Sequence, residues 1–251
     1  MVQDDGSPSL GVVRTHFEFK ETAATIIAEG RFVPLARQSI FDSRDIIERF
    51  IALDPFFKDT LEPYEPPWNA HPLIKRMCAA AKKADVGPMA AVAGAIAEEA
   101  VNSMVAAGAR QAVVDNGGDI AMFLSEPLKV ALYTGTSRIQ DIGFNVPADN
   151  KNYAICTSSG TIGPSISFGI ADAAVVFAAD AALADACATR LGNEVKDRRK
   201  KAILNAIKTI LHIEGVEGAL VIVGDKLVMS GKLPELVKMK ADEGKIAKIG
   251  F

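Results

Sequence analysis

The opening of the chain alternates apolar and polar residues and then changes to helical spacing. Val13, Thr15 and Phe17 alternate with charged neighbours, and the apolar pattern resumes near residue 24, so residues 11–28 predict a β-hairpin. Residues 33–53 place apolar side chains every three or four positions and stop before Asp54-Pro55. The pattern therefore predicts an opening strand pair followed by one amphipathic helix.

An irregular segment and two further helices are predicted next. Residues 61–69 hold Pro63, Pro66 and Pro67 together with Trp68, which favours an irregular crossing segment. Helical spacing returns over residues 71–84 and 88–107, and Pro88 suits a first helical position.

The second part of the chain reads as sheet, then helices, then a closing strand pair. The strand-like runs are residues 111–115, 120–124, 128–133, 153–157 and 171–177. Asp180 is placed to cap a helix that ends near Leu191, another helix fits residues 199–211, and residues 219–229 predict a hairpin turning at Gly224-Asp225. This is an α+β order, and without a break in composition we expect one domain over residues 1–251.

Composition and charge narrow the class of protein. With 49% hydrophobic and 24% charged residues the chain is ordinary for a globular protein, and a net charge of -3 argues against a nucleic-acid binder. The long apolar stretch at residues 170–191 carries Asp172, Asp180 and Asp185, so we expect no membrane span. Three unpaired cysteines and a start without a signal-peptide pattern predict a cytoplasmic protein.

Asn116, Gly117, Gly118 and Asp119 lie between two predicted strands. Paired glycines permit positive φ and close approach of a ligand, and Asp115 adds a second carboxylate beside the turn. A plain hairpin turn and a ligand-binding turn are both consistent with this composition.

Hydroxyls and glycines also gather after the strand at residues 153–157, in Thr157, Ser158, Ser159 and Gly160. Such a loop can present backbone N–H groups to a phosphate, although a simple flexible turn has the same composition. The Gly-Lys ending of a Walker sequence is absent, so this is not a P-loop.

Asp185 interrupts an otherwise small and apolar helix, and Thr189 follows four residues later on the same face. A carboxylate and a hydroxyl in this arrangement can supply part of an oxygen shell for Mg²⁺, while an internal carboxylate bonded to backbone is the alternative. Cys156 and Cys187 lie near these segments, and we interpret both as buried apolar residues. The three histidines show no metal-site spacing.

Four blocks taken in order resemble the signature of the ApbE-like superfamily of flavin transferases. They are residues 85–94, 115–120, 157–160 and 184–189. More closely, the chain resembles a compact, uncharacterised branch of that superfamily found in archaea and some bacteria.

The resemblance implies a T-fold-like architecture, with antiparallel sheets, helices packed on one side and two related halves. It implies that Asp185 and Thr189 bind Mg²⁺. The nucleotide, FAD or FMN, would be held by Gly87, by the turn of Asn116, Gly117, Gly118 and Asp119, and by the loop of Thr157, Ser158, Ser159 and Gly160. These segments are expected to converge on one cleft.

Two departures from the family pattern bear on activity. Ala91-Val92 stands where the family's transferases carry Lys-Gly, and residues 163–169 replace a His-x-x-Asp-Pro segment. We therefore expect a protein that binds a flavin or another nucleotide with Mg²⁺, and a protein acceptor or a homo-oligomer is compatible with the family. Two alternatives stay open: an active Mg-dependent FMN transferase or FAD pyrophosphohydrolase, and a non-catalytic accessory protein of sulfur or redox-cofactor metabolism.

Overall fold

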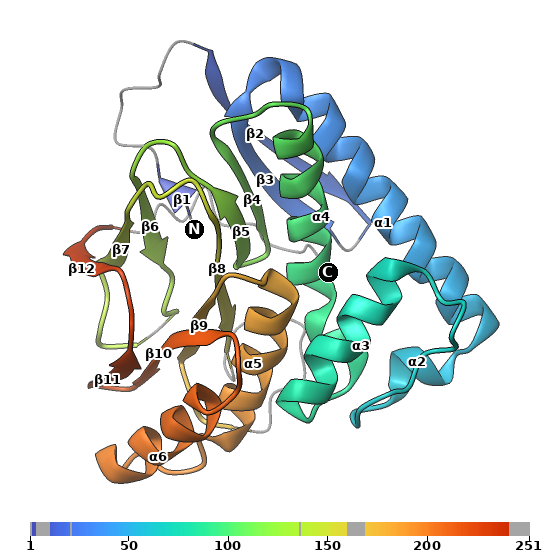
Figure 1. Cartoon of the computed structure of the whole chain (residues 1–251). Helices are drawn as coiled ribbons and strands as arrows, with labels where there is room; N and C mark the ends of the chain where they lie inside the picture. The colour runs from blue at the N-terminus through green and yellow to red at the C-terminus, as the bar shows by residue number, and fades with distance from the viewer. Residues whose placement is uncertain (1, 4–10, 21, 136, 160–168, 241–251) are drawn as a thin grey trace.

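The computed structural model describes residues 2–3, 11–20, 22–135, 137–159 and 169–240, and these form three layers (Figure 1). An eight-stranded antiparallel sheet lies in the middle, with the helices on one face and a four-stranded sheet on the other. The predicted α+β class, with antiparallel sheets and helices on one side, is confirmed.

The eight-stranded sheet is built from two halves of the same plan, a hairpin, then helices, then a hairpin. Its strand order is β11-β10-β9-β8-β5-β4-β3-β2, and the halves meet where β5 pairs with β8. The first half contains β2 (Val12–Phe19), β3 (Thr22–Glu29), α1 (Val33–Leu53), α2 (Phe56–Asp59), α3 (Pro72–Ala84), α4 (Val92–Ala106), β4 (Ala112–Asn116) and β5 (Asp119–Phe123). The second contains β8 (Asn152–Ser158), β9 (Ala173–Ala178), α5 (Ala181–Glu194), α6 (Lys200–Leu211), β10 (Val216–Val223) and β11 (Lys226–Gly231).

The four-stranded sheet draws its strands from distant parts of the chain. Its order is β1-β6-β7-β12, with β1 (Val2–Gln3), β6 (Leu128–Leu132), β7 (Ile142–Val146) and β12 (Glu235–Lys238). Of these, the sequence pattern predicted only β6. The short strands β1, β7 and β12 exist through pairing with sequence-distant partners, which local periodicity does not report.

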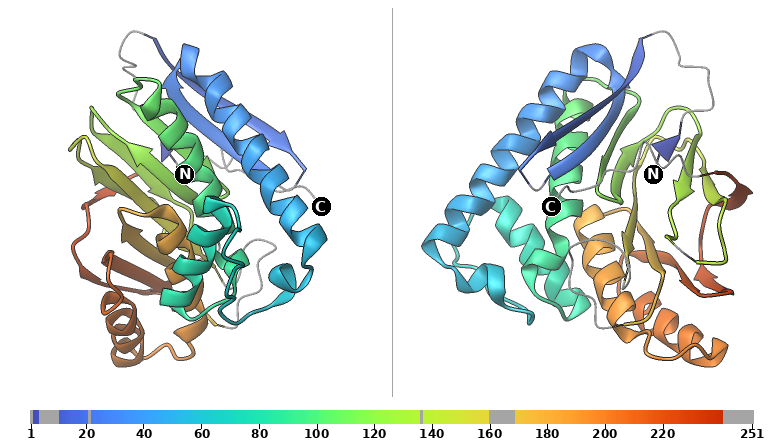
Figure 2. Two further views of the ribbon diagram at one scale, coloured as in Figure 1. Left: turned by 45° about the vertical axis from the view of Figure 1, so that its right-hand side comes forward. Right: turned by 180° about the vertical axis from the view of Figure 1, so that it is seen from behind.

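Strand alternation divides the core into two clusters on the two faces of the large sheet. Ala112, Ala121 and Ala154 face the helices, whereas Val113, Ile120 and Ile155 face the small sheet. Small side chains on the helix face let α4 and α5 lie close to the strands. Figure 2 shows these helices covering that face of the sheet.

Most helix boundaries follow the sequence prediction. Asp180 caps α5 as expected, since its Oδ1 accepts a hydrogen bond from the N–H of Leu183 at 2.8 Å. Pro88 begins a short 3-10 helix, η2 (Pro88–Ala91), and α4 follows it. The stretch Pro88–Ala106 is long and apolar enough to cross a membrane by length and composition alone, but in this fold it packs against α1, α5, β4 and β5 as a core helix.

Candidate functional site

The candidate site lies where the β4–β5 turn, the end of β8, the start of α4 and the middle of α5 meet. Asn116 Nδ2 donates to the carbonyl oxygen of Ala93 at 3.1 Å, which fastens the turn to α4. Asp185 Oδ2 accepts from the N–H of Gly94 at 2.9 Å, which fastens α5 to the same turn of α4. Segments about 90 residues apart in sequence are thus joined by direct hydrogen bonds.

Gly94 makes this close helix crossing possible. A Cβ at residue 94 would lie less than 3.0 Å from the backbone carbonyl of Ala181 and from Cβ of Asp185. Since real Cβ atoms essentially never come so close, only glycine lets α4 deliver its N–H to the Asp185 carboxylate.

Asp119 and Asp185 form a pair of carboxylates, which we call the acid pair. Asp185 is 8% exposed, and Asp119 is half-buried as a residue but has a buried Oδ1. Burial raises the pKa of Asp119 well above its usual range, and the charge of Asp185 raises it further. Burial also raises the pKa of Asp185, and the N–H groups of Gly94 and Ala93 oppose that rise. Ionising the acid pair in the folded protein therefore costs free energy.

Hydrogen bonding satisfies only part of Asp119. The neighbouring Cys156 thiol and Thr157 N–H lower the pKa of this carboxylate, yet its Oδ1 is buried with no hydrogen-bond partner in the described part of the chain. Among the described residues, no lysine or arginine is a main cause of the pKa shift of either acid. A buried oxygen without a partner and two uncompensated carboxylates are features that a bound cation would satisfy.

The donor set suits Mg²⁺ better than a soft metal. Within the described residues no group of three or more His, Cys, Asp or Glu side chains is arranged as a metal centre. Two carboxylates, with the Thr189 hydroxyl one helical turn beyond Asp185, leave positions for water and phosphate, which Mg²⁺ commonly keeps as ligands. The residues present fit a magnesium ion that shares its coordination with a phosphorylated ligand.

A surface pocket of about 340 Å³ brings Thr189 together with Gly87. Met89 and Leu61 add apolar lining, and Lys58 and Arg190 add positive charge. Asp85 and Glu194 also line the pocket, and both form ion pairs with Arg190. Arg190 also donates to Asp85 Oδ2 at 2.6 Å, so this arginine holds the helix-entry turn against α5. The pocket therefore combines apolar surface with charges of both signs, and neither Asp119 nor Asp185 lines it.

The packing of the chain requires glycine at residue 87, apart from the nucleotide-binding role that the family resemblance implies for it. A Cβ at this position would clash with the backbone carbonyl of Thr60, because the segment after α2 crosses directly over the turn. Gly87 also lines the pocket, and its role in binding a nucleotide stays a prediction.

The β4–β5 turn places Asp115 and Asp119, the two carboxylates that flank it, on opposite faces of the sheet. Gly117 and Gly118 have φ of 74° and 104°, so the two-residue turn itself requires glycine. Asp119 shares the helix-facing side with Asn116, whereas Asp115 pairs with Ile120, which packs in the core on the small-sheet side. Asp115 Oδ1 accepts from the N–H of Gly118 at 3.0 Å. Asp115 therefore braces the turn, and the acid that pairs with Asp119 is Asp185.

The predicted hydroxyl loop begins later than the sequence suggested. Thr157 and Ser158 belong to β8, where they pair with Val175 and Ala174, and Ser159 follows the strand. Gly160 lies outside the described residues, as does most of the 163–169 interval. The Thr157 N–H nevertheless lowers the pKa of Asp119, so this segment lies beside the acid pair.

One residue near the site escaped the sequence analysis. Glu98 on α4 accepts from the N–H of Ala181 at 3.1 Å, and burial with nearby Asp180 raises its pKa to about 7. Its signal was an acid within an alanine-rich helix. Cys156, expected to be a buried apolar residue, is buried, and its Sγ donates to the carbonyl oxygen of Ala181 at 3.5 Å. Burial and the neighbouring Asp119 raise the pKa of its thiol well above the usual range, so it stays protonated. Cys187 is likewise buried, with its pKa raised to about 12.

Comparison with solved structures defines the class of protein by its fold. The apo flavinyl transferase ApbE of Pseudomonas stutzeri matches with a TM-score of 0.55 at 12% identity, over 88% of this chain and 94% of that one. The ApbE protein of Thermotoga maritima matches with a TM-score of 0.52 at 12% identity, over 88% and 96% of the two chains. The fold is that of ApbE proteins.

The chain belongs to the family described as AbpE bacteria, whose model matches residues 5–225. A UPF0280 protein of Methanocella arvoryzae is 46% identical over 243 residues, covering 96% of this chain and 98% of its own. The resemblance found in the sequence is thereby confirmed at the level of family and fold.

Proposed function

We propose that this protein binds a flavin nucleotide, FAD or FMN, together with Mg²⁺. The observation that carries the proposal is the acid pair, Asp119 and Asp185, buried among the described residues without a cation. Bound Mg²⁺ would neutralise this charge and the charge of the ligand's phosphates. The names of the ApbE structures, which share the fold, support a flavin as the ligand.

Each part of the site has a role in this proposal. Asp185 and Thr189 on α5 would hold the metal, with Asp119 contributing the oxygen that lacks a hydrogen bond. The pocket lined by Gly87, Leu61 and Met89 would receive the nucleotide, and Lys58 and Arg190 would face its phosphates. The Asn116–Asp119 turn holds the metal side of the site in place through Ala93.

Transfer of FMN should be weak compared with binding. Ala91 is buried and apolar where the family's transferases carry a lysine, so one cation that could contact a phosphate is missing. A site that keeps its metal ligands but lacks a charge-stabilising group loses more in the transition state than in ground-state binding.

Calorimetry tests the proposal directly. FAD, FMN and ADP are titrated into the protein with and without Mg²⁺, and we expect binding that tightens at least about tenfold with Mg²⁺. Asp185→Asn should abolish the Mg²⁺ effect because it removes one of two buried charges. Asp225→Asn, an exposed acid in the β10–β11 turn, is the matched control and should bind like the wild type.

A mass-shift assay with a threonine-containing acceptor peptide and FAD separates the remaining alternatives. Mg²⁺-dependent flavinylation lost in Asp185→Asn would show an active FMN transferase, and release of FMN without peptide labelling would show an FAD pyrophosphohydrolase. If none of the three nucleotides binds with Mg²⁺ present, the proposal is wrong and the accessory-protein alternative remains.

A further inference from the structure

Strand β2 forms one edge of the eight-stranded sheet, beside α1, and no described strand pairs with its outer side (Figure 2). It is eight residues long, contains no proline and pairs with β3 in an unbroken register. Edge strands usually carry a proline or a bulge, or are short, because exposed backbone donors and acceptors recruit other strands. This edge has none of those features, and the protection that it does carry is charge, at Arg14, Glu18 and Lys20.

The backbone geometry shows which residues present hydrogen-bonding groups outward. The N–H of Gly30 donates to the carbonyl oxygen of Gly11 at 3.1 Å, and the β2–β3 register continues from that pair. Since hydrogen-bonded positions alternate in antiparallel strands, the odd-numbered residues of β2 bond to β3. The even-numbered residues, Arg14, His16 and Glu18, therefore direct their backbone N–H and C=O groups away from the sheet.

The side chains of β2 are complementary to a second, antiparallel copy of the same strand. With a two-fold axis at His16, Arg14 lies opposite the partner's Glu18, and Glu18 lies opposite the partner's Arg14. On the other face the same register sets Val13 against the partner's Phe19. Val13 and Phe19 are each 41% exposed in the single chain, which is high for apolar residues in a strand.

Another in-phase register is less favourable. Moving the axis by one residue to Phe17 keeps the outward hydrogen-bonding positions in phase and sets His16 opposite the partner's Glu18, but it places Arg14 opposite the partner's Lys20, two permanent like charges. Charge complementarity therefore selects the register centred on His16.

We propose that β2 is a self-association edge at which two copies of this chain join their eight-stranded sheets across a two-fold axis at His16. The second copy is the occupant because the edge is complementary in charge and in apolar contacts to itself. This inference is independent of the proposed flavin-binding function.

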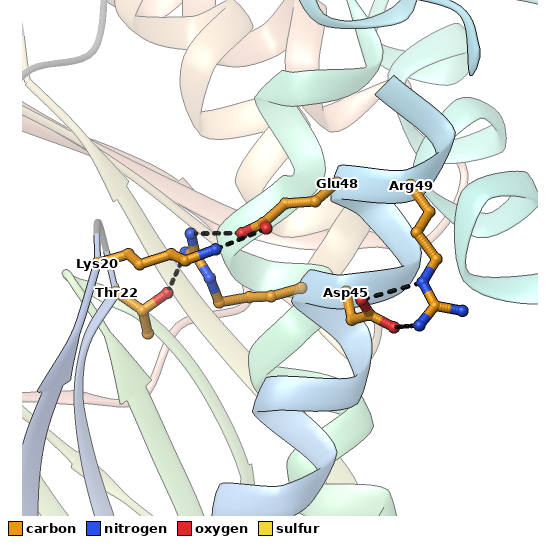
Figure 3. A network of polar contacts seen from close by, with 6 residues as sticks. Lys20, Thr22, Asp45, Glu48 and Arg49 are labelled. Carbon is orange, nitrogen blue, oxygen red and sulfur yellow. Dashed lines mark hydrogen bonds and ion pairs between the residues drawn. The ribbon is translucent and has the colours of Figure 1, made fainter. Parts of the chain in front are cut away.

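The hairpin that carries this edge is fastened to α1. Lys20 Nζ donates to Glu48 Oε2 at 2.7 Å, and Arg44 Nη1 donates to Thr22 Oγ1 at 2.5 Å (Figure 3). On the helix face, Phe17 and Phe19 both pack edge-on against Phe41 of α1. An edge held in a fixed shape loses little conformational freedom on pairing, which favours association.

Charge reversal at two positions provides the decisive test. The wild type should sediment as a dimer in analytical ultracentrifugation at micromolar concentration. Arg14→Glu and Glu18→Arg should each weaken the dimer at least about tenfold, because each creates two like-charge pairs in the symmetric interface. The double variant Arg14→Glu/Glu18→Arg should restore the dimer, since the pairs are then complementary again.

A cysteine cross-link tests the position of the axis. Two His16→Cys copies would lie with Cα atoms about 5.5 Å apart, within disulfide range, whereas two Lys20→Cys copies would be separated by about 27 Å. We expect a covalent dimer only for His16→Cys after mild oxidation, because the native cysteines Cys78, Cys156 and Cys187 are buried.

Three results would overturn the inference. They are a wild type that stays monomeric at 100 micromolar, a dimer that both single charge reversals leave unchanged, and a double variant as weak as the singles. A chain ending at residue 240 identifies a competing occupant: if only this shortened form dimerises, residues 241–251 cover the edge in the full chain and the inference is wrong.

Discussion

The acid pair and the polar network on α1 differ in whether their charged side chains have oppositely charged partners. On α1, Glu48 is bonded to both Lys20 and Arg44, and Asp45 is bonded to Arg49 (Figure 3). At the acid pair, two buried carboxylates meet without any described cation. Exposed charges with partners are worth little to stability, whereas buried charges without partners are costly. The cost at the acid pair is thus a reason to expect a ligand there and not on α1.

The largest expected effect comes from forcing α4 and α5 apart, which would expose the acid pair and erase the contrast with α1. Gly94→Val places a side chain against the Ala181 carbonyl and should lower the free energy of unfolding by about 3 kcal/mol or more. Urea denaturation measures this change in the free energy of unfolding. Gly117→Ala, in open space but at positive φ, should cost only about 1 kcal/mol. Equal costs for the two variants would contradict the close-crossing argument.

Neutralising one member of the acid pair should stabilise the ligand-free protein. Burial raises the pKa of Asp185, so its charged form is held at a cost at pH 8, and Asp185→Asn removes that cost while keeping an acceptor for Gly94. We expect a gain of about 1–2 kcal/mol, seen as a melting temperature higher by roughly 2–8 °C. A lower melting temperature at pH 8 without metal would show that the pair is compensated.

Glu98 sharpens the comparison because its pKa is raised although a cation, Arg76, lies nearby. Its pKa is raised to about 7, mainly by burial and then by Asp180, while Arg76 opposes the rise. The folded state binds this proton more tightly than the unfolded state, so the contribution is fully present below about pH 4.5 and is lost as pH rises through 7. Glu98→Gln should therefore gain stability over the wild type between pH 5 and 8, by about 1 kcal/mol. Thermal melts of both proteins across that range measure the difference, and a constant difference would contradict the shift.

The smallest effect is expected on α1. Lys20→Ala removes an exposed ion pair with Glu48 and should change the free energy of unfolding by less than about 0.5 kcal/mol, and less still in 0.5 M salt. Urea denaturation at two salt concentrations measures the change. A loss above 1 kcal/mol would mean that the network, and not only the packing of Phe17 on Phe41, holds the hairpin on α1.

Local patterns in the sequence predicted the long elements well. Helix α1 has the expected bounds of 33–53, because its apolar spacing and the Asp54-Pro55 break are local signals. β7 escaped because it is short and contains Gly143, which fits against the backbone of β6 only once the two strands pair. Its existence depends on a contact that no local pattern encodes.

The sequence predicted the segments that form the candidate site, but it did not predict that Asp119 lies beside Asp185. Asp119 was assigned to a nucleotide-binding turn with Asp115, whereas strand alternation sends these two side chains to opposite faces of the sheet. Applying that alternation from Asn116 across the two-residue turn would have placed Asp119 on the helix face. Its meeting with Asp185 needed the packing of α5 on the sheet, which depends on alanines spread over many strands.

The small sheet carries a consequence for how this chain is made. β6 and β7 come from the middle of the chain, yet one outer strand, β1, starts at residue 2 and the other, β12, ends at residue 238. During synthesis β7 emerges about 90 residues before β12, so the edge of β7 that pairs with β12 has no partner strand from the described chain over that interval. The small sheet is therefore completed later than the first half of the large sheet.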